Sequence, residues 1–349
     1  MVGAATRHAS PPSALRIVFF GTPAFAVPSL EHLRRSRHPV IGVVTQPDRP
    51  HGRGQHHSDG PVKQVALAHQ LPMLQPERIQ DPVFLDSLRD WQPDLGIIAA
   101  YGKILSQTLL EIPRLGMINV HASLLPKYRG AAPIHRAIMA GERETGITIM
   151  RVIKELDAGP MLGVLAHPIQ PDQTSEEVEQ ELAFLGAALL LGVLEDVAAG
   201  RAIEIPQDPA AATFAPRLTK GEGLIDWTSS ALRMHDKIRG LHPWPHAFTY
   251  LNGARYILLK SEPGRTAGRL PDPRVACPGE ILVASGEQLI VKTGDNEGSI
   301  RILEIQSEGG KPLQAREFLA GHPLHAGQVF GRPNLESQIP NPGPPGPKP

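Results

Sequence analysis

The strongest constraint on the fold is an alternation of short apolar runs and helical spacing over the first two hundred residues. Residues 16–21 (RIVFFG) form an apolar run closed by glycine, and residues 23–35 then show helical periodicity with a proline near the first turn. Repetition of strand and helix is typical of a parallel sheet covered by helices. The pattern recurs as apolar runs at 40–45, 95–100 and 116–121 and as helical spacing at 62–70 and 133–140.

The alternation ends with two more strand-like runs and one long helix. Residues 147–152 and 161–169 are strand-like, and residues 174–199 begin with a Ser- and Glu-rich cap and continue as an apolar-periodic helix. We therefore predict an α/β domain over residues 16–200: a Rossmann-like, mostly parallel sheet with helices on both faces.

The rest of the chain has a different pattern, as expected when 349 residues exceed the ~250 that one core usually holds. Residues 201–219 are rich in Pro and Ala without clear periodicity, which predicts a linker. Residues 220–330 contain one helical stretch followed by short strand-like runs, and a small β-barrel is expected there. The two ends, 1–15 and 331–349, are expected to be disordered, with an organelle transit peptide as the alternative for the first.

Composition excludes several classes of protein. The longest nearly unbroken apolar stretch, 183–194, is shorter than the ~20 residues a bilayer requires, so we expect no membrane span. One cysteine, Cys277, permits no intrachain disulfide and no multi-thiolate zinc site, and a cytoplasmic location is expected. Gly21-Thr22-Pro23 lacks the later glycines of a dinucleotide fingerprint, which disfavours a nicotinamide cofactor.

Three polar residues form the candidate catalytic set. Asn119 and His121 lie two residues apart in an expected strand, so their side chains share one face near its carboxyl end, where open α/β sheets bind ligands. Asp157 precedes Gly159-Pro160, a turn that could hold its carboxylate against the imidazole. An amide donor beside a supported imidazole suits acyl transfer to an amine. A structural histidine and a turn-forming aspartate are the alternatives.

The motifs around these residues resemble those of the folate-dependent formyltransferases. They are Asn119-Val120-His121, Ser123-Leu124-Leu125-Pro126, residues 128–133 (YRGAAP) and Leu156-Asp157-Ala158-Gly159. Further motifs resemble the branch of the family that acts on methionyl-tRNA: residues 20–23 (FGTP), 45–50 (TQPDRP), 52–54 (GRG), 225–227 (IDW) and 243–245 (PWP). The resemblance runs from about residue 16 to about residue 330.

The resemblance implies transfer of the formyl group of 10-formyltetrahydrofolate to the α-amine of methionine on initiator tRNA, without a metal. It implies that Asn119 stabilises the oxyanion and that His121, supported by Asp157, moves protons. It places the folate pterin beside the loop Ser123, Leu124, Leu125 and Pro126. It also implies that residues 220–330 are an OB-like domain that binds tRNA, and we expect a monomer.

Four basic residues are candidate tRNA contacts. The resemblance implies that Arg53 reads the end of the acceptor stem from a loop over residues 46–60. Gln55, His56 and His57 stand where the family commonly has lysines, which predicts weaker or pH-dependent phosphate contacts. A metal held by His51, His56 and His57 is the alternative. In the second domain the candidates are Lys220, Lys237 and Arg239, with a solvated surface charge as the alternative for each. Trp227 and Trp244 could stack on bases, although packing is the favoured interpretation.

Three other functions remain open. A formyltransferase acting on a sugar amine or another small amine would keep the catalytic set but would not need Arg53 or the second domain. A formyltetrahydrofolate hydrolase would place water where the amine enters. A non-catalytic RNA-binding protein would have no physical reason to keep all three polar residues.

Overall fold

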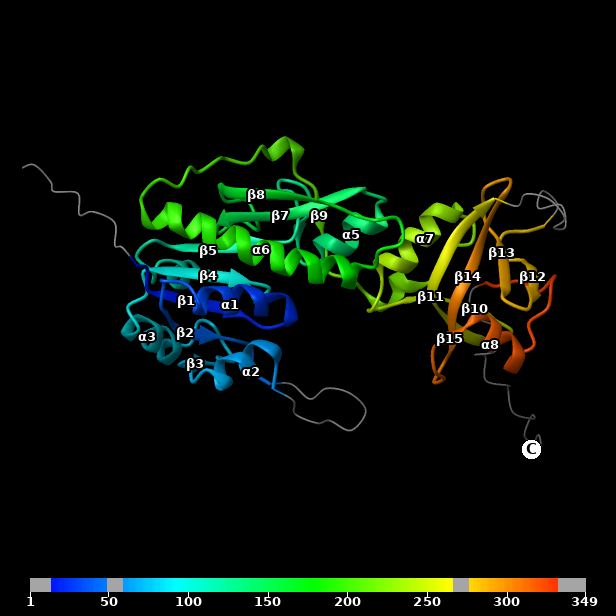
Figure 1. The fold of residues 1–349 in the computed structure, drawn as a ribbon, viewed down its shortest axis with the longest axis horizontal. Helices are drawn as coiled ribbons and strands as arrows, with labels where there is room; N and C mark the ends of the chain where they lie inside the picture. Colours follow the sequence, from blue (N-terminus) through cyan, green and yellow to red (C-terminus); the bar gives the residue numbers. More distant parts are fainter. Residues whose placement is uncertain (1–13, 49–58, 266–275, 332–349) are drawn as a thin grey trace, which may run out of the picture. The chain divides into compact units, whose positions relative to one another are not determined.

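A seven-stranded sheet organises the first half of the protein, and an antiparallel sheet organises the second (Figure 1). The computed structural model describes residues 14–48, 59–265 and 276–331. The chain divides into two units: the first contains residues up to 137, 142–171 and 176–217, and the second contains 138–141, 172–175 and the residues from 218 onward.

The first sheet confirms the predicted mostly parallel architecture. Its strand order is β3-β2-β1-β4-β5-β7-β8, in which β1 to β5 run parallel and β7 and β8 run antiparallel to their neighbours. The order reverses beside β1, which lies between β2 and β4, and such a reversal opens a crevice at the carboxyl ends of the strands. The strands are β1 (Ile17–Gly21), β2 (Val40–Val44), β3 (Met73–Leu74), β4 (Leu95–Ala99), β5 (Met117–His121), β7 (Glu144–Arg151) and β8 (Met161–Pro168).

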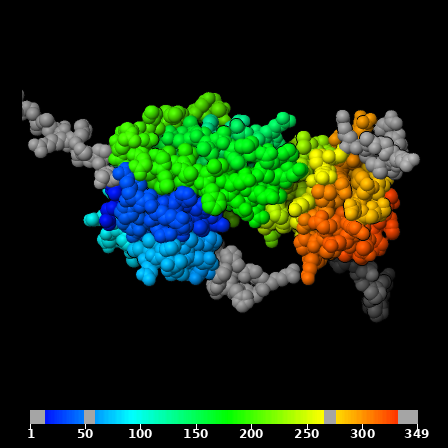
Figure 2. All heavy atoms as spheres, viewed as in Figure 1, coloured from blue at the N-terminus to red at the C-terminus, as the bar shows by residue number. Residues whose placement is uncertain are grey.

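Helices cover both faces of this sheet. On one face, side chains of α3 (Pro82–Asp90) and α4 (Gln107–Leu110) share a buried cluster with Val18, Phe20 and Met117. On the other face, α6 (Ser175–Ala198) packs so closely that an added Cβ at its Gly186 would lie 2.9 Å from Val120. In Figure 2, green atoms of residues around 150–200 cover the upper part of this unit, and blue atoms of the N-terminal strands and helices cover its lower part. The remaining helices are η1 (Ala24–Ala26), α1 (Val27–Arg34), α2 (Pro61–Ala68) and α5 (Pro133–Met139).

The segment expected to be a linker is packed into the first unit as far as Arg217. Its strand β9 (Phe214–Ala215) pairs in parallel with β6 (Arg129–Gly130), and its Ile205 pairs with Met161 at the start of β8. Helix η2 (Pro209–Ala211) lies between these contacts. The segment is held by backbone pairing with Met161 and with β6. Such pairing requires no hydrophobic period, so the sequence of the segment indicates only a loop.

The second unit is the expected C-terminal antiparallel β domain. Its sheet has the order β10-β11-β14-β13-β12, with β15 on β14. Residues 327–331 bond to Gly279 and Ile281 on one side and to Tyr250 of β10 on the other, which closes the gap between the two ends of the sheet. The elements are η3 (Lys220–Gly223), α7 (Ala231–Gly240), β10 (Ala247–Leu251), β11 (Ala254–Arg265), β12 (Ile281–Ser285), β13 (Gln288–Lys292), β14 (Gly298–Ser307), β15 (Leu313–Gln314) and α8 (Ala315–Gly321).

Trp227 belongs to the core of this unit, which confirms the packing interpretation. Its ring stacks on Phe330 at 5.6 Å between centroids, and its Nε1 donates to Thr249 Oγ1 at 2.9 Å. Trp244 is 48% exposed, so stacking on a base stays a prediction for that residue. No helix of the described ranges is long and apolar enough to span a membrane. The predictions for the two tails fall almost entirely on residues 1–13 and 332–349, outside the described residues.

Phe330→Ala is expected to destabilise the second unit by about 3–5 kcal/mol, the usual cost of truncating a buried phenylalanine. The ring is 1% exposed and contacts both Trp227 and Tyr256. Urea unfolding followed by tryptophan fluorescence measures the loss. The adjacent Val329→Ala is the control, since Val329 is 45% exposed; equal small losses in the two variants would contradict this account of barrel closure.

Candidate active site

The structure places His121 where the sequence predicts, at the carboxyl end of β5. The side chain is 5% exposed. Asn119 shares its face of the sheet, because the two residues alternate with Val120. The antiparallel register sets Thr148 opposite His121 and Met150 opposite Asn119, so these four side chains lie on one face of β5 and β7.

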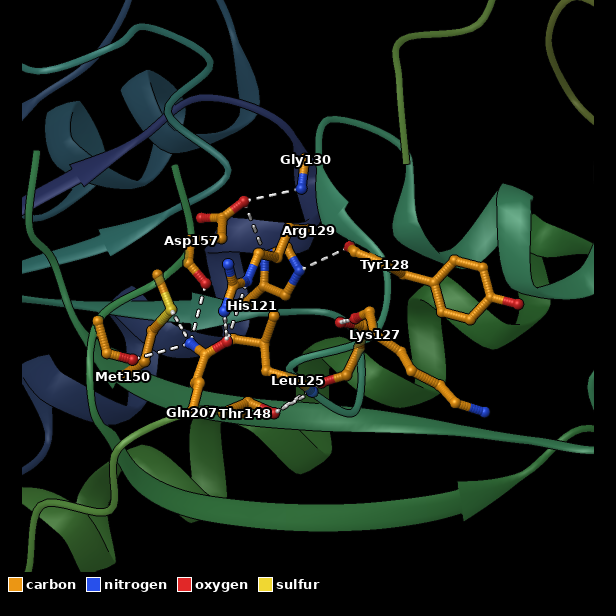
Figure 3. Close-up of polar contacts among 12 residues, drawn as sticks. His121, Leu125, Lys127, Tyr128, Arg129, Gly130, Thr148, Met150, Asp157 and Gln207 are labelled. Carbon is orange, nitrogen blue, oxygen red and sulfur yellow. Dashed lines mark hydrogen bonds and ion pairs between the residues drawn. The ribbon is translucent and has the colours of Figure 1, made fainter. Parts of the chain in front are cut away.

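Both ring nitrogens of His121 meet oxygen atoms (Figure 3). Nδ1 lies 3.7 Å from Asp157 Oδ2, and Nε2 lies 3.1 Å from the backbone oxygen of Tyr128. A carbonyl oxygen can only accept, so the tautomer assigned to this geometry carries its proton on Nε2. Nδ1 faces the carboxylate at ion-pair distance, so a proton gained there during a reaction would be stabilised by Asp157.

Asp157 reaches the imidazole through an unusual backbone conformation. Its φ is +47°, in the left-handed region that residues other than glycine enter at a cost. Its Oδ2 accepts a hydrogen bond of 2.8 Å from the backbone N–H of Gly130. A Cβ at Gly159 would lie 1.9 Å from the carbonyl oxygen of Arg151, so the turn after Asp157 has room only for glycine.

A buried amide and a buried guanidinium flank this turn, and sequence reasoning missed both. Gln207 Nε2 donates to the backbone oxygens of Asp157 at 2.9 Å and Gly159 at 2.8 Å. Its Oε1 accepts from Arg129, at 3.1 Å from Nε and 2.7 Å from the nearer terminal nitrogen. Arg129 lies in the motif at residues 128–133, but no local signal marks Gln207, since its partners are 48 to 78 residues away.

The loop 123–126 is anchored from β7. Thr148 Oγ1 donates to the backbone oxygen of Ser123 at 2.7 Å and accepts from the backbone N–H of Leu125 at 3.1 Å. Ser123 is fully buried and its hydroxyl donates to the carbonyl of Lys127, whereas Leu124 is partly exposed. Pro126, joined to Leu125 by a cis peptide bond, is also partly exposed.

A small pocket of about 70 Å³ opens beside this loop. Tyr128 forms part of its wall, and its hydroxyl donates to Glu142 Oε1 at 2.8 Å. Burial, followed by the Glu142 carboxylate, raises the pKa of the Tyr128 phenol. The phenol therefore stays protonated at neutral pH and acts as a hydrogen-bond donor. The pocket is lined by Leu124, Lys127, Tyr128, Glu142, Glu144 and Thr145.

The candidate tRNA contacts differ in what they offer a phosphate. Arg53 lies outside the described residues, as do His51, Gln55, His56 and His57. Lys220 is exposed. Lys237 donates to the backbone oxygen of Leu224 at 2.7 Å, and burial lowers the pKa of its ammonium.

The burial of Arg239 argues against its prediction as a tRNA contact. The side chain is 6% exposed, and its guanidinium bonds to Asp236 and to the backbone oxygen of Gln173. Paired and buried, it presents no surface charge to a nucleic-acid backbone. Over the described ranges, no three His, Cys, Asp or Glu residues are arranged to hold a metal ion.

The formyl transferase family model matches residues 15–194, and the model of the formyl transferase C-terminal domain matches residues 217–323. Methionyl-tRNA formyltransferase from Caldanaerobacter subterraneus is 46% identical over 317 residues, covering 90% of this chain and all of that protein. The enzyme of the same name from Ruminiclostridium cellulolyticum is 43% identical over 318 residues, covering 91% of this chain and all of its own.

Solved structures of lower identity share the fold. An N-formyltransferase from Helicobacter canadensis, in complex with folinic acid and dTDP-3-aminofucose, aligns with a TM-score of 0.62 at 15% identity, covering 82% of this chain and 98% of that one. HypX from Aquifex aeolicus, in complex with tetrahydrofolic acid, aligns with a TM-score of 0.60 at 18% identity, covering 88% of this chain and 47% of HypX. With both formyl transferase domains present and this identity to relatives over nine tenths of its length, the chain belongs to the methionyl-tRNA formyltransferase family.

Proposed function

We propose that this enzyme transfers the formyl group of 10-formyltetrahydrofolate to the α-amine of methionine on initiator tRNA. The observation that carries the proposal is the His121 ring, held between the Asp157 carboxylate and the Tyr128 carbonyl on the face that bears Asn119. Identity of 43–46% to methionyl-tRNA formyltransferases supports the choice of acceptor. The cytoplasmic location, the monomeric state and the lack of a metal stay predictions.

The proposed mechanism is direct attack through a tetrahedral intermediate. The unprotonated α-amine adds to the formyl carbon, and the bond between that carbon and the folate nitrogen then breaks. One proton leaves the amine and one is gained by the folate nitrogen, so the reaction needs a group that moves protons between them. His121 takes this role, which is typically worth about 10² to 10⁴ in rate.

Asn119 and Asp157 stabilise the two charges that develop during the reaction, the negative oxyanion and the positive imidazolium. The Asn119 amide donates to the oxyanion of the intermediate, an interaction typically worth about 3 kcal/mol. The Asp157 carboxylate stabilises the imidazolium that forms while His121 holds the proton. Asp157 is itself held by Gly130 N–H, so the carboxylate stays near the ring through the proton transfers.

The loop from Ser123 to Pro126 is proposed to contact the folate pterin. Leu124 offers a partly exposed apolar side chain, Leu125 is buried, and the backbone of the loop is fixed by the Thr148 hydroxyl. A fixed backbone loses little entropy when it hydrogen-bonds a flat, polar ring. For tRNA, Arg53 and the exposed Lys220 remain the proposed contacts, and Lys237 is a weaker candidate because its ammonium already bonds to Leu224.

A small amine acceptor is the alternative function. The Helicobacter canadensis structure contains an amino-sugar nucleotide, but at 15% identity the likeness concerns the fold alone. Identity of 43–46% to methionyl-tRNA formyltransferases over nine tenths of the chain favours the tRNA acceptor.

Replacing His121 by alanine is expected to lower turnover at least ~10²-fold while folate binding persists, because the proton carrier is lost and the loop 123–126 is not. Rapid-mix formylation assays and folate titration measure the two effects. His32→Ala is the control, since His32 lies on α1 and its ring contacts the Pro28 carbonyl. Unchanged turnover in His121→Ala would remove this residue from the mechanism.

Thr148→Val is expected to weaken folate binding by about 10-fold, because two backbone groups of the loop lose a partner at roughly 1–3 kcal/mol in total. Equilibrium titration with tetrahydrofolate provides the measurement. Thr148→Ser keeps the hydroxyl and should bind nearly as well as the parent. Equal affinity of the valine variant and the parent would separate this loop from the folate site.

Acceptor preference tests the proposed substrate directly. With 10-formyltetrahydrofolate as donor, methionylated initiator tRNA should be formylated much faster than methionylated elongator tRNA, free methionine or an amino-sugar nucleotide. The formylated products are separated by chromatography. Formylation of the sugar amine but of neither tRNA would overturn the proposal in favour of the small-amine alternative.

A further inference from the structure

The chain between the two matched domains contributes a buried side chain to the site. Gln207 lies after the first matched range, 15–194, and before the second, 217–323. It is 9% exposed and sits between the turn that carries Asp157 and the strand β6 that carries Arg129. A glutamine this buried in a Pro- and Ala-rich connector needs a physical reason.

The hydrogen bonds of the Gln207 amide give that reason. A glutamine amide has two donor hydrogens and two acceptor sites, and all four are used here. The acceptors face the Arg129 guanidinium, and the donors face the backbone oxygens of Asp157 and Gly159. The amide orientation is unambiguous, because a flipped amide would set oxygen against carbonyl and nitrogen against guanidinium.

Gln207, β6 and the Asp157 turn form a closed network of hydrogen bonds. Asp157 has its backbone in the left-handed region, so the surrounding structure must hold it there. Gln207 holds the main chain of the turn, and Gly130 N–H holds its carboxylate. Arg129 and Gly130 are consecutive residues of β6, so one short strand receives both the Gln207 side chain and the Asp157 side chain.

The connector also fixes that strand. β9 lies beside β6, and the backbone N–H groups of Ala131 and Ala132 donate to the carbonyl of Ala215. A Cβ at Gly130 would lie 2.7 Å from the same carbonyl oxygen, so the two strands approach as closely as glycine allows. The same segment, residues 201–217, therefore holds the Asp157 turn through Gln207 and the Gly130 donor through β9.

We propose that Gln207 is a positioning residue for formyl transfer: it fixes the Asp157 turn so that the carboxylate stays within reach of the His121 ring. The inference rests on the proposed function, in which Asp157 supports His121 during proton transfer. In this proposal Gln207 contacts no reacting atom. Its replacement should therefore lower turnover and leave the Michaelis constants for folate and tRNA nearly unchanged. The loss of turnover should vanish when Asp157 has no charge.

A double-mutant cycle on the full chain tests this dependence. Gln207→Leu removes the hydrogen bonds to Arg129, Asp157 and Gly159 at similar volume. Asp157→Asn removes the charge while leaving the backbone oxygen that Gln207 bonds. Gln207→Leu alone should lower kcat by roughly 10- to 100-fold, the scale of a displacement of about 1 Å. In the Asp157→Asn background the same substitution should cost less than about 2-fold.

Two more variants separate positioning from folding. Gln207→Glu keeps the acceptors for Arg129 but loses the donors to Asp157 and Gly159, so it should lower kcat nearly as much as Gln207→Leu. Gln107→Leu is the matched control: Gln107 is exposed on α4, bonds to Glu111, and should leave kcat and the thermal midpoint unchanged. If Gln207→Leu does not fold, the same cycle is run with Gln207→Glu.

Each outcome bears on one of the two proposals. Equal fold-losses of kcat with and without the Asp157 carboxylate would overturn the positioning role, as would a Gln207→Glu enzyme with the activity of the parent. A large loss in Asp157→Asn with none in either Gln207 variant would also overturn it while leaving the proposed function intact. Full activity of Asp157→Asn would instead contradict the proposed mechanism itself.

Discussion

The site depends on a chain return that places the Asp157 carboxylate beside His121, at the carboxyl end of β5. The register pairs His121 with Thr148 but Ile118 with Arg151, so the chain leaves β7 three residues, or roughly 10 Å, from the imidazole. The connection from β7 to β8 must return across that distance. The left-handed backbone of Asp157 and the close contact of Gly159 with the Arg151 carbonyl are local consequences of this return.

Such a turn cannot hold itself, since a strained backbone persists only when its surroundings fix it. The two faces of the sheet are covered by different parts of the chain. Helix α6 packs on the face that carries Val120, which leaves the face of His121 to be covered by other parts of the chain. The connector with Gln207 and the short strand β6 reach that side. The fold therefore places the supports of Asp157 opposite its longest helix.

Local patterns made much of this predictable. The strand that carries Asn119 and His121 was predictable from its own short apolar run. Because side chains alternate along a strand, both residues were expected on one face. The mostly parallel sheet follows from the repeated alternation of strand and helix. The partnership of Asp157 with His121 needed the resemblance to a family as well, because a Gly-Pro turn alone does not fix where its neighbour points.

Long-range hydrogen bonding was not predictable. Gln207 has no apolar period around it, and its importance lies in partners that come close only in the folded chain. Arg239 shows the opposite error, in which a visible charge suggested a surface role. Its partner Asp236 is three residues away on α7, and a helix brings such residues to the same side. The charge of a side chain can be predicted from the sequence, but in this case its burial could not.

The fold and the choice of acceptor are separate matters. Structures with 15–18% identity share the architecture, and one of them holds an amino-sugar nucleotide, so the sheet alone does not decide which amine is formylated. The connector is bound to the Asp157 turn through Gln207 and to β6 through β9, whereas Ile203 is 75% exposed and η2 has no buried residue. Changes of length at η2 are therefore tolerable only if the chain from Gln207 to Ala215 still reaches both the Asp157 turn and β6. The segment that joins the two units in the chain is thus constrained by its contacts with the Asp157 turn and β6 as well as by the need to connect them.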